Sequence, residues 1–171
     1  GELLIGGDSH TPTCGAVGMV AVGVGGLEIA AGMASGRCFL TYPKVVRVNL
    51  EGTLAPWVAA KDIALELLRS FTTKGNVGIA IEYGGSALAS LTVPERATIT
   101  NLGAEMGVTT SIFPSDDVTR AFLTAQGRAD DWAPIAADAD AQYEKVITLD
   151  ISKIIPNIAC PHSPDNVKTV K

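Results

Sequence analysis

Aromatic residues, charged residues and cysteines are all scarce in this sequence. Of its 171 residues, 5% are aromatic and 18% are charged, whereas 47% are hydrophobic. Such a composition is typical of a globular chain with a buried core and excludes a highly charged, disordered polypeptide. The formal net charge of −5 also argues against a nucleic-acid partner, because that surface needs an excess of Lys and Arg to neutralise phosphates.

The sequence also lacks a long uninterrupted hydrophobic run. Its most apolar stretch, residues 15–36, is broken by glycines and by Glu28, whereas a bilayer-spanning helix needs about 20 predominantly apolar residues. We therefore expect no membrane association. The first residues do not have the pattern of a signal peptide either.

Cysteine is limited to Cys14, Cys38 and Cys160, which are too widely spaced for a disulfide framework or a local metal site. This usage favours a reducing, cytoplasmic compartment. We accordingly expect no metal ligand among the residues of this chain.

Short apolar runs alternate along the chain with segments of helical periodicity. Strands are predicted at 3–5, 45–50, 77–83, 109–113 and 145–149, and helices in the second half of 15–35 and at 61–71, 92–106 and 115–125. The helix that starts at Thr92 is the best defined, because Thr92 and Glu95 form a capping box and Pro94 lies in the first turn. The alternation predicts an α/β fold with three α/β/α layers around a mostly parallel sheet.

The same pattern suggests how the chain is divided. Residues 45–155 hold most of the predicted elements and are expected to form one compact α/β domain. We interpret residues 1–44 as a loop and a helix at the edge of a preceding domain. Residues 156–171, which are rich in proline, are interpreted as a tail or linker.

Asp8, Ser9 and His10 follow directly after the first predicted strand. A carboxylate and an imidazole two residues apart in a turn can hydrogen-bond, which fixes the tautomer of the ring and suits it to general acid–base chemistry. In the alternative, Asp8 only stabilises the turn and His10 is exposed, and the spacing alone favours that alternative. The three residues are not a Ser–His–Asp triad, whose members come from separate segments.

Glycines are concentrated between residues 15 and 26, which raises the possibility of a nucleotide site. The dinucleotide fingerprint fails, however, because Glu28 stands where a third glycine is required after Gly23 and Gly25. A phosphate-binding P-loop is excluded too, since no Gly-Lys-Ser/Thr follows. The glycines are better explained by close packing of helices.

Asn101 and Glu105 are four residues apart on the capped helix and therefore share one face. Ile99, Leu102 and Met106 are expected to form the opposite, apolar side. The default explanation is a solvated helix face. The alternative is a polar pair that points into a cleft, and the spacing does not separate the two.

Several separated segments together resemble the aconitase family. The resemblance is carried, in the expected order and over essentially the whole chain, by residues 3–13, 23–26, 34–45, 60–62, 82–83, 101–107, 109–114 and 161–165. It includes Gly7-Asp8-Ser9-His10-Thr11 and Asn101-Leu102-Gly103-Ala104-Glu105. Several motifs in register are far more specific than any one of them.

The resemblance implies reversible dehydration of a small hydroxy-tricarboxylate, citrate to isocitrate, by a hydro-lyase with a [4Fe–4S] cluster. By position, Asp8, His10 and Glu105 match catalytic residues of the family, and Ser9 and Asn101 match substrate-binding ones. Glu105 is expected to pair with a histidine upstream of this sequence.

The resemblance also implies that part of the enzyme is missing. The cluster cysteines are expected beyond the end of the chain, and Cys14, Cys38 and Cys160 do not match their positions. We therefore expect an internal fragment that binds no cluster, is inactive alone, and packs against the rest of the same polypeptide.

Within the family, two features favour an aconitate hydratase. The isopropylmalate and homoaconitate dehydratases usually have a cysteine where Thr100 stands, and Ala-Lys in place of Val108-Thr109. The alternatives are the large subunit of a 3-isopropylmalate or homoaconitate dehydratase, or a non-catalytic α/β binding module.

Overall fold

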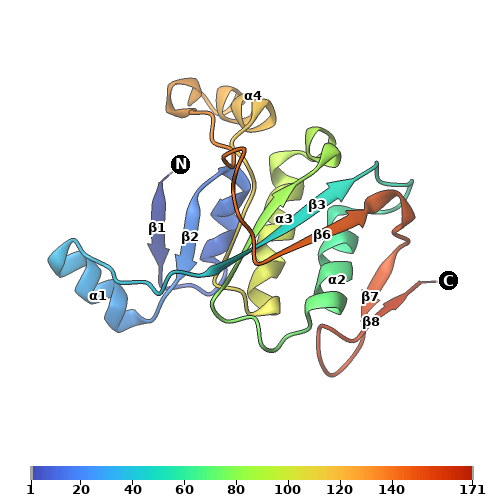
Figure 1. Ribbon diagram of the computed structural model, residues 1–171, viewed down its shortest axis with the longest axis horizontal. Coiled ribbons are helices and arrows are strands. Elements are labelled where there is room, and N and C mark those ends of the chain that lie inside the picture. Colours follow the sequence, from blue (N-terminus) through green and yellow to red (C-terminus); the bar gives the residue numbers. More distant parts are fainter. Residues whose placement is uncertain (1, 171) are drawn as a thin grey trace.

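The computed structural model describes residues 2–170. Its centre is a four-stranded sheet of β3 (Lys44–Glu51), β4 (Ile79–Gly84), β5 (Thr110–Ile112) and β6 (Lys145–Asp150). All neighbouring strands are parallel, in the order β5-β4-β3-β6 (Figure 1). The predicted α/β fold with a mostly parallel sheet is therefore confirmed.

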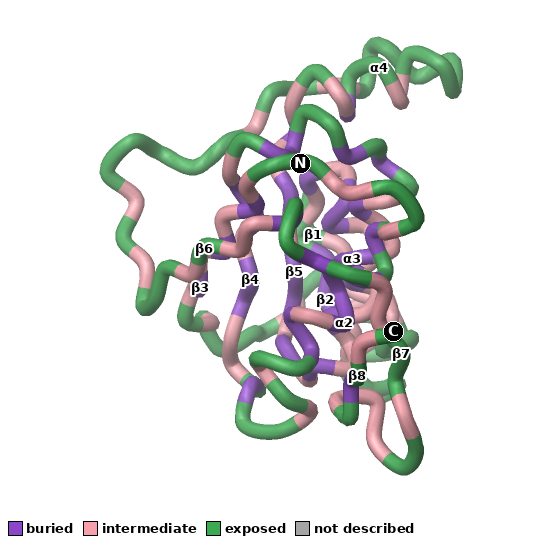
Figure 2. The backbone as a smooth tube through the Cα atoms, turned by 90° about the vertical axis from the view of Figure 1, so that its right-hand side faces the viewer, coloured by how far each residue is buried: buried purple, intermediate pink, exposed green. Residues whose placement is uncertain are grey.

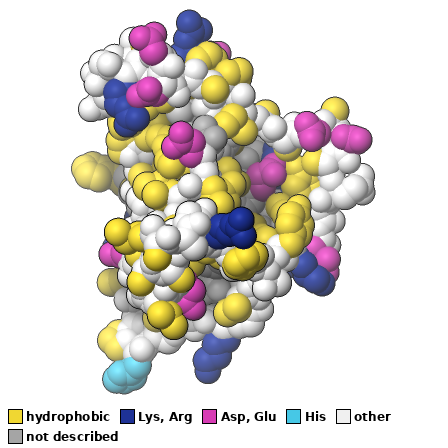
Figure 3. Space-filling model, turned by 90° about the vertical axis from the view of Figure 1, so that its left-hand side faces the viewer, with side chains coloured by type: hydrophobic (Ala, Val, Ile, Leu, Met, Phe, Trp, Pro, Cys, Tyr) yellow, Lys and Arg dark blue, Asp and Glu magenta, His cyan; other side chains and the backbone are white. Residues whose placement is uncertain are grey.

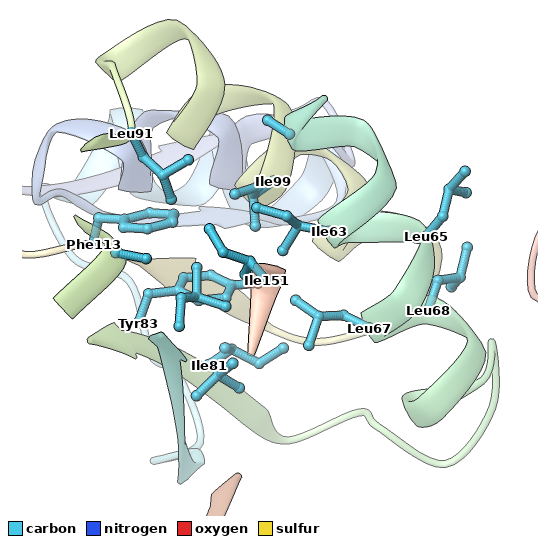
Figure 4. Close-up of a cluster of buried hydrophobic side chains, with 14 of the residues drawn as sticks. Ile63, Leu65, Leu67, Leu68, Ile81, Tyr83, Leu91, Ile99, Phe113 and Ile151 are labelled. Atoms are coloured by element: carbon cyan, nitrogen blue, oxygen red, sulfur yellow. The ribbon is translucent and has the colours of Figure 1, made fainter. Parts of the chain in front are cut away.

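Helices α2 (Ala60–Phe71) and α3 (Val93–Met106) pack against one face of this sheet and against each other. Alternate residues of a strand point to opposite faces, and in β3 the buried ones are Val46, Val48 and Leu50. Tyr83 and Phe113 stack with their ring centroids 4.4 Å apart at the centre of the core (Figure 4). Figure 2 shows the buried residues gathered in the sheet and these two helices, whereas α4 (Asp117–Ala125) is mostly exposed.

The opposite face of the sheet carries an ion pair between Arg47 and Glu82, which are neighbours in register on β3 and β4. Tyr143, from the segment before β6, donates its hydroxyl hydrogen to Glu82 at 2.8 Å. Residues 127–142 are irregular apart from a short 3₁₀ helix, η3 (Ala129–Asp131), and a single antiparallel bridge between Ile135 and Ser115.

The N-terminal part forms a separate parallel pair, β1 (Leu3–Gly6) and β2 (Val20–Gly23), joined by the 3₁₀ helix η1 (Thr11–Val17). Strand β2 was not predicted. A Cβ atom on Gly15 would lie 1.8 Å from the carbonyl oxygen of Ser111, and the Phe113 N–H donates to the Gly15 carbonyl at 2.9 Å. The prediction that these glycines allow helices to pack closely together is therefore wrong at Gly15. This glycine instead allows η1 to approach strand β5.

Helix α1 (Gly26–Ser35) has no buried residue. Large hydrophobic side chains are exposed in and after it, with Met33 84% and Phe39 90% exposed. Figure 3 views the molecule from the side of β1 and α1, and many hydrophobic side chains lie at that surface. No helix among residues 2–170 is both long and apolar enough to cross a membrane.

The C-terminal residues form an antiparallel hairpin of β7 (Asn157–Ala159) and β8 (Val167–Thr169), where the sequence indicated only an irregular tail. The hairpin is tied to α2, because the buried Asp62 accepts the Asn157 N–H at 2.6 Å. Figure 4 shows Leu65 and Leu68 on the side of α2 away from Tyr83. Strands of three residues are too short for periodicity to reveal them. The division at residues 44 and 155 stays a prediction.

Candidate active site

His10 lies in the turn between β1 and η1. The Asp8 carboxylate accepts the backbone N–H of His10 at 2.6 Å, and the Asp8 carbonyl accepts the N–H and the hydroxyl of Thr11 at 3.1 and 2.7 Å. A Cβ on Gly23 would lie 2.6 Å from the Asp8 carbonyl oxygen, so this turn sits directly on the end of β2. Asp8 thus stabilises the turn, and the expected contact between its carboxylate and the imidazole is not among the hydrogen bonds of the described residues.

The imidazole of His10 instead contacts helix α3. Its Nδ1 lies 3.1 Å from the carbonyl oxygen of Asn101, and its Nε2 lies 3.5 Å from Oε1 of Glu105. A carbonyl oxygen can only accept, so Nδ1 carries a hydrogen and Nε2 is the atom that gains or loses a proton. Both side chains are about 40% exposed, at 38% for His10 and 42% for Glu105, so the proton is accessible from outside.

Helix α3 fixes the positions of Asn101 and Glu105. It starts where Glu95 reaches back to accept the Thr92 N–H at 2.8 Å, as the capping box predicts. Ile99 and Met106 are fully buried on its other side. Leu102 departs from the expectation, because it is partly exposed and lies beside Asn101 in a groove.

Two threonines connect these parts, and sequence reasoning did not identify them. The Asn101 side-chain amide donates to the Thr13 hydroxyl at 2.9 Å, which donates to the His10 carbonyl at 2.7 Å. The buried Thr100 hydroxyl lies 3.1 Å from the Thr13 carbonyl. Thr13 follows His10 by three residues, but no spacing rule marks that position as part of a site.

Ser9 lies in the same turn as His10 and is exposed. Its hydroxyl makes none of the hydrogen bonds found among residues 2–170, so it can bind a ligand. The structure therefore brings His10, Asn101 and Glu105 together, places Ser9 beside them, and gives Asp8 a structural contact.

A groove of about 460 Å³ adjoins this cluster between the start of α2 and the middle of α3. Thr13 and Asn101 line it, together with Lys61, Pro94, Ala97, Thr98 and Leu102. Thr13 and Asn101 also belong to the hydrogen-bond network of His10, so the groove borders that network.

A second hollow of about 510 Å³ lies at the carboxyl ends of β4 and β5, which is a common ligand position in parallel sheets. It contains none of the predicted site residues. Its charged groups are already paired, Arg47 with Glu82 and Asp116 with the buried Arg96. We therefore assign it a structural role.

The described residues do not fit an iron–sulfur cluster. No three His, Cys, Asp or Glu side chains among them are grouped so as to hold a metal ion. Cys14, Cys38 and Cys160 are free and lie in η1, after α1 and after β7. These residues therefore do not form a complete ligand set for a cluster.

Comparisons with known proteins agree on one family. The model of the Aconitase family (aconitate hydratase) matches residues 1–171. The chain is 41% identical to the 3-isopropylmalate dehydratase large subunit of Elusimicrobium minutum, over 99% of this chain and 41% of that protein. It is also 41% identical to the same subunit of Nitratidesulfovibrio vulgaris, over 99% of this chain and 40% of that protein.

A third relative is the aconitase–ribosomal protein bL21m fusion protein of Schizosaccharomyces pombe, which is 39% identical over 96% of this chain and 19% of that protein. The chain spans about 40% of the length of the two dehydratase subunits.

Proposed function

This chain belongs to the aconitase family, and we propose that it is part of a hydro-lyase that removes water from a small hydroxy acid, with His10 as the proton-carrying residue. The observation that carries this proposal is the position of the imidazole, with one nitrogen at a backbone carbonyl and the other at a carboxylate. Such an arrangement fixes the tautomer and leaves a single nitrogen for proton transfer.

Each residue of the site then has a distinct task. His10 holds a proton at Nε2 and delivers it to the hydroxyl as the C–O bond breaks, so that water leaves, while Glu105 balances the positive charge of the ring. The proton lost from the neighbouring carbon passes to a base outside the described residues. The Asn101 carbonyl holds the ring in place, and Ser9 offers a free hydroxyl to a substrate oxygen. Asp8 holds the turn that presents Ser9 and His10, and its catalytic role stays a prediction.

We propose 3-isopropylmalate as the first substrate to test, because the two relatives at 41% identity are 3-isopropylmalate dehydratase large subunits. These relatives favour that alternative over the citrate reaction predicted from the sequence. Citrate remains the second candidate for two reasons. Thr100 and Val108-Thr109 differ from the residues that the dehydratases usually have at these positions, and the aconitase fusion protein is 39% identical to this chain.

The complete protein is further proposed to carry a [4Fe–4S] cluster on residues other than those described, and to act in the cytoplasm. Because two relatives are named large subunits, a smaller partner chain is part of the proposal. None of the steps assigned to His10, Ser9 or Glu105 depends on the geometry of the cluster.

The experiment uses the complete gene product, prepared without oxygen and supplied with iron and sulfide. The absorbance of the unsaturated product is followed with 3-isopropylmalate, citrate or homocitrate as substrate. We expect turnover of one of these acids, and we expect His10→Ala to lower kcat by about 10²- to 10⁴-fold with unchanged iron content. His162→Ala, at an exposed position in the hairpin loop, is the control and should be fully active.

The experiment tests the proposed reaction and the role of His10 separately. If the wild-type protein turns over none of the three acids, the proposed function is wrong. If it is active and His10→Ala is equally active, only the role of His10 is wrong.

A further inference from the structure

We infer that Lys61 binds a carboxylate of the substrate from the groove beside Asn101. This inference rests on the proposed function and adds to it a binding residue that neither the motif nor the imidazole cluster contains. The groove connects Lys61 to the residues around His10, because Asn101 and Thr13 line it and also belong to the hydrogen-bond network that holds His10.

Among residues 2–170, Lys61 is the only cationic residue that lines this groove. Its side chain is exposed, and among residues 2–170 it has no ion pair and no hydrogen bond. The neighbouring acidic residue, Asp62, does not pair with Lys61. Its carboxylate is buried and accepts the N–H groups of Ala59 and Asn157. Lys61 therefore keeps a free ammonium group at the edge of the site.

A free cation is what the proposed substrate requires. The charged side chains close to Nε2 of His10 include the carboxylate of Glu105, and Asp8 lies in the same turn. A hydroxy acid with two or three carboxylates would be repelled by these groups unless a positive charge faced it. Lys61 supplies that charge in the groove that Asn101 also lines, and an ammonium binds a carboxylate through a charge-assisted hydrogen bond.

The position of Lys61 has no evident structural reason. It lies in the first turn of α2 (Ala60–Phe71), where the helix dipole disfavours a positive charge. The backbone there is nevertheless firmly placed, because Ala60 and Ile63 are buried and α2 packs against α3. Lys61 can thus be replaced without disturbing the core, and its Cα stays fixed relative to Asn101.

Polar partners for the same ligand are present in the groove. Asn101 uses its amide nitrogen toward Thr13, and its Oδ1 makes no hydrogen bond among the described residues. Ser9 carries a free hydroxyl in the adjacent turn. A carboxylate bound by the Lys61 ammonium would therefore lie in the groove lined by Asn101, whose carbonyl oxygen contacts the ring of His10.

The test compares Lys61→Met and Lys61→Arg in the complete, cluster-loaded protein, with Lys74→Met as the matched control. Lys74 is an exposed lysine just after the other end of α2 and does not line the groove. We expect Lys61→Met to raise KM by about 10- to 100-fold, the size of one lost charged hydrogen bond, with kcat changed by less than about threefold. Lys61→Arg should recover part of the affinity, and Lys74→Met should behave as wild type.

A second readout identifies the group that Lys61 contacts. The binding of a saturated analogue of the active substrate, with all its carboxylates, is measured by calorimetry and compared with that of its monomethyl esters. Lys61→Met should weaken the full acid and leave unchanged the ester whose contacted carboxylate is blocked. An unchanged KM in Lys61→Met, or equal weakening of the acid and of every ester, would overturn the inference while the wild-type activity still supports the proposed function. An inactive wild-type protein would overturn both.

Discussion

The imidazole of His10 and the carboxylate of Glu105 lie 3.5 Å apart, although one belongs to the turn after β1 and the other to the last turns of α3. The resemblance to the aconitase family led us to expect a different, upstream histidine opposite Glu105. Among the described residues His10 takes that place. The pair joins the N-terminal strands to the α3 helix, so the site depends on how these two parts pack.

Replacement of Glu105 by Gln tests this relationship directly. The amide has nearly the same shape but no charge, so a protonated His10 loses its counter-charge. We expect kcat of the complete protein to fall by about 10- to 100-fold, with KM changed less than about threefold. The melting temperature should stay nearly constant, because an ion pair between half-exposed groups contributes little stability.

The control for this variant is Glu144→Gln, which removes a somewhat more exposed carboxylate that pairs with Lys44 at the start of β3. It should leave kcat unchanged. Normal kinetics in Glu105→Gln would show that the pair is structural.

Thr13 holds the Asn101 amide and the His10 carbonyl at once, through one hydroxyl. Thr13→Val keeps the shape of the side chain but removes both hydrogen bonds, so the turn can shift relative to α3. We expect kcat to fall about tenfold, because small misplacements of a catalytic group are costly. Thr13→Ser restores the hydroxyl and should recover most of the activity. Equal rates in the Val and Ser variants would contradict this positioning role.

The parts that the sequence predicted well have a long periodic pattern or a clear start signal. Strand β3 and helix α2 carry periodic apolar positions over eight and 12 residues, and the buried residues follow them. Helix α3 was located by its capping box. The pairs β1–β2 and β7–β8 have only three or four residues per strand. They form through contacts with other elements, which local periodicity does not record.

The candidate site also has a part that the sequence predicted and a part that it did not. The residues Ser9, His10 and Asn101 were predicted through a resemblance of motifs, because motifs record residue type and order. The contact between His10 and Glu105 and the hydroxyl of Thr13 depend on how η1 lies against α3, which Gly15 makes possible by its close approach to Ser111. The spacing of residues along the sequence does not reveal how closely η1 approaches these elements.

Arg96 is fully buried and connects the segment that precedes α3 to the loop between β5 and α4. Its guanidinium donates to both carboxylate oxygens of Asp116 at 2.9 and 2.7 Å, and to the carbonyls of Leu88, Leu91 and Pro114. Arg96→Met would leave these acceptors and the Asp116 charge without a partner. We expect a loss of about 3–5 kcal/mol in the free energy of unfolding of the 171-residue chain in urea. Arg120→Met, on an exposed helix face, should cost far less.

Asp116 gives this ion pair a defined pH dependence. Burial alone would raise the pKa of its carboxyl, but the hydrogen bonds and charge of Arg96, together with the Thr119 N–H, outweigh burial and hold the pKa below its ordinary value. A lowered pKa in the folded state means that the stabilisation is complete above about pH 4, the unfolded value, and is lost as the pH falls further.

Asp116→Asn should therefore be less stable than wild type at pH 7, and the difference should shrink only below about pH 4. Urea unfolding at a series of pH values measures it. Asp130→Asn, at an exposed position, is the control. A difference that stays constant down to pH 2 would contradict the assignment.

Tyr83 is buried at the centre of the core, and its hydroxyl has no hydrogen-bond partner among the described residues. Tyr83→Phe removes this unsatisfied group and keeps the stacking on Phe113. We expect the free energy of unfolding to stay equal or to rise by up to about 1 kcal/mol. Tyr143→Phe is the matched comparison, because that hydroxyl donates to Glu82 at 2.8 Å. It should cost about 0.5–1.5 kcal/mol.

Alkaline pH should widen the advantage of Tyr83→Phe. Burial raises the pKa of the Tyr83 hydroxyl well above its ordinary value, so the folded state holds the neutral form while the unfolded chain ionises above about pH 10. The wild-type chain therefore loses stability above that pH through this group, and the Phe variant does not. Urea unfolding at pH 8 and pH 10.5 measures the change. A Phe variant that is less stable than wild type at both values would mean that the hydroxyl has a partner, such as a bound water.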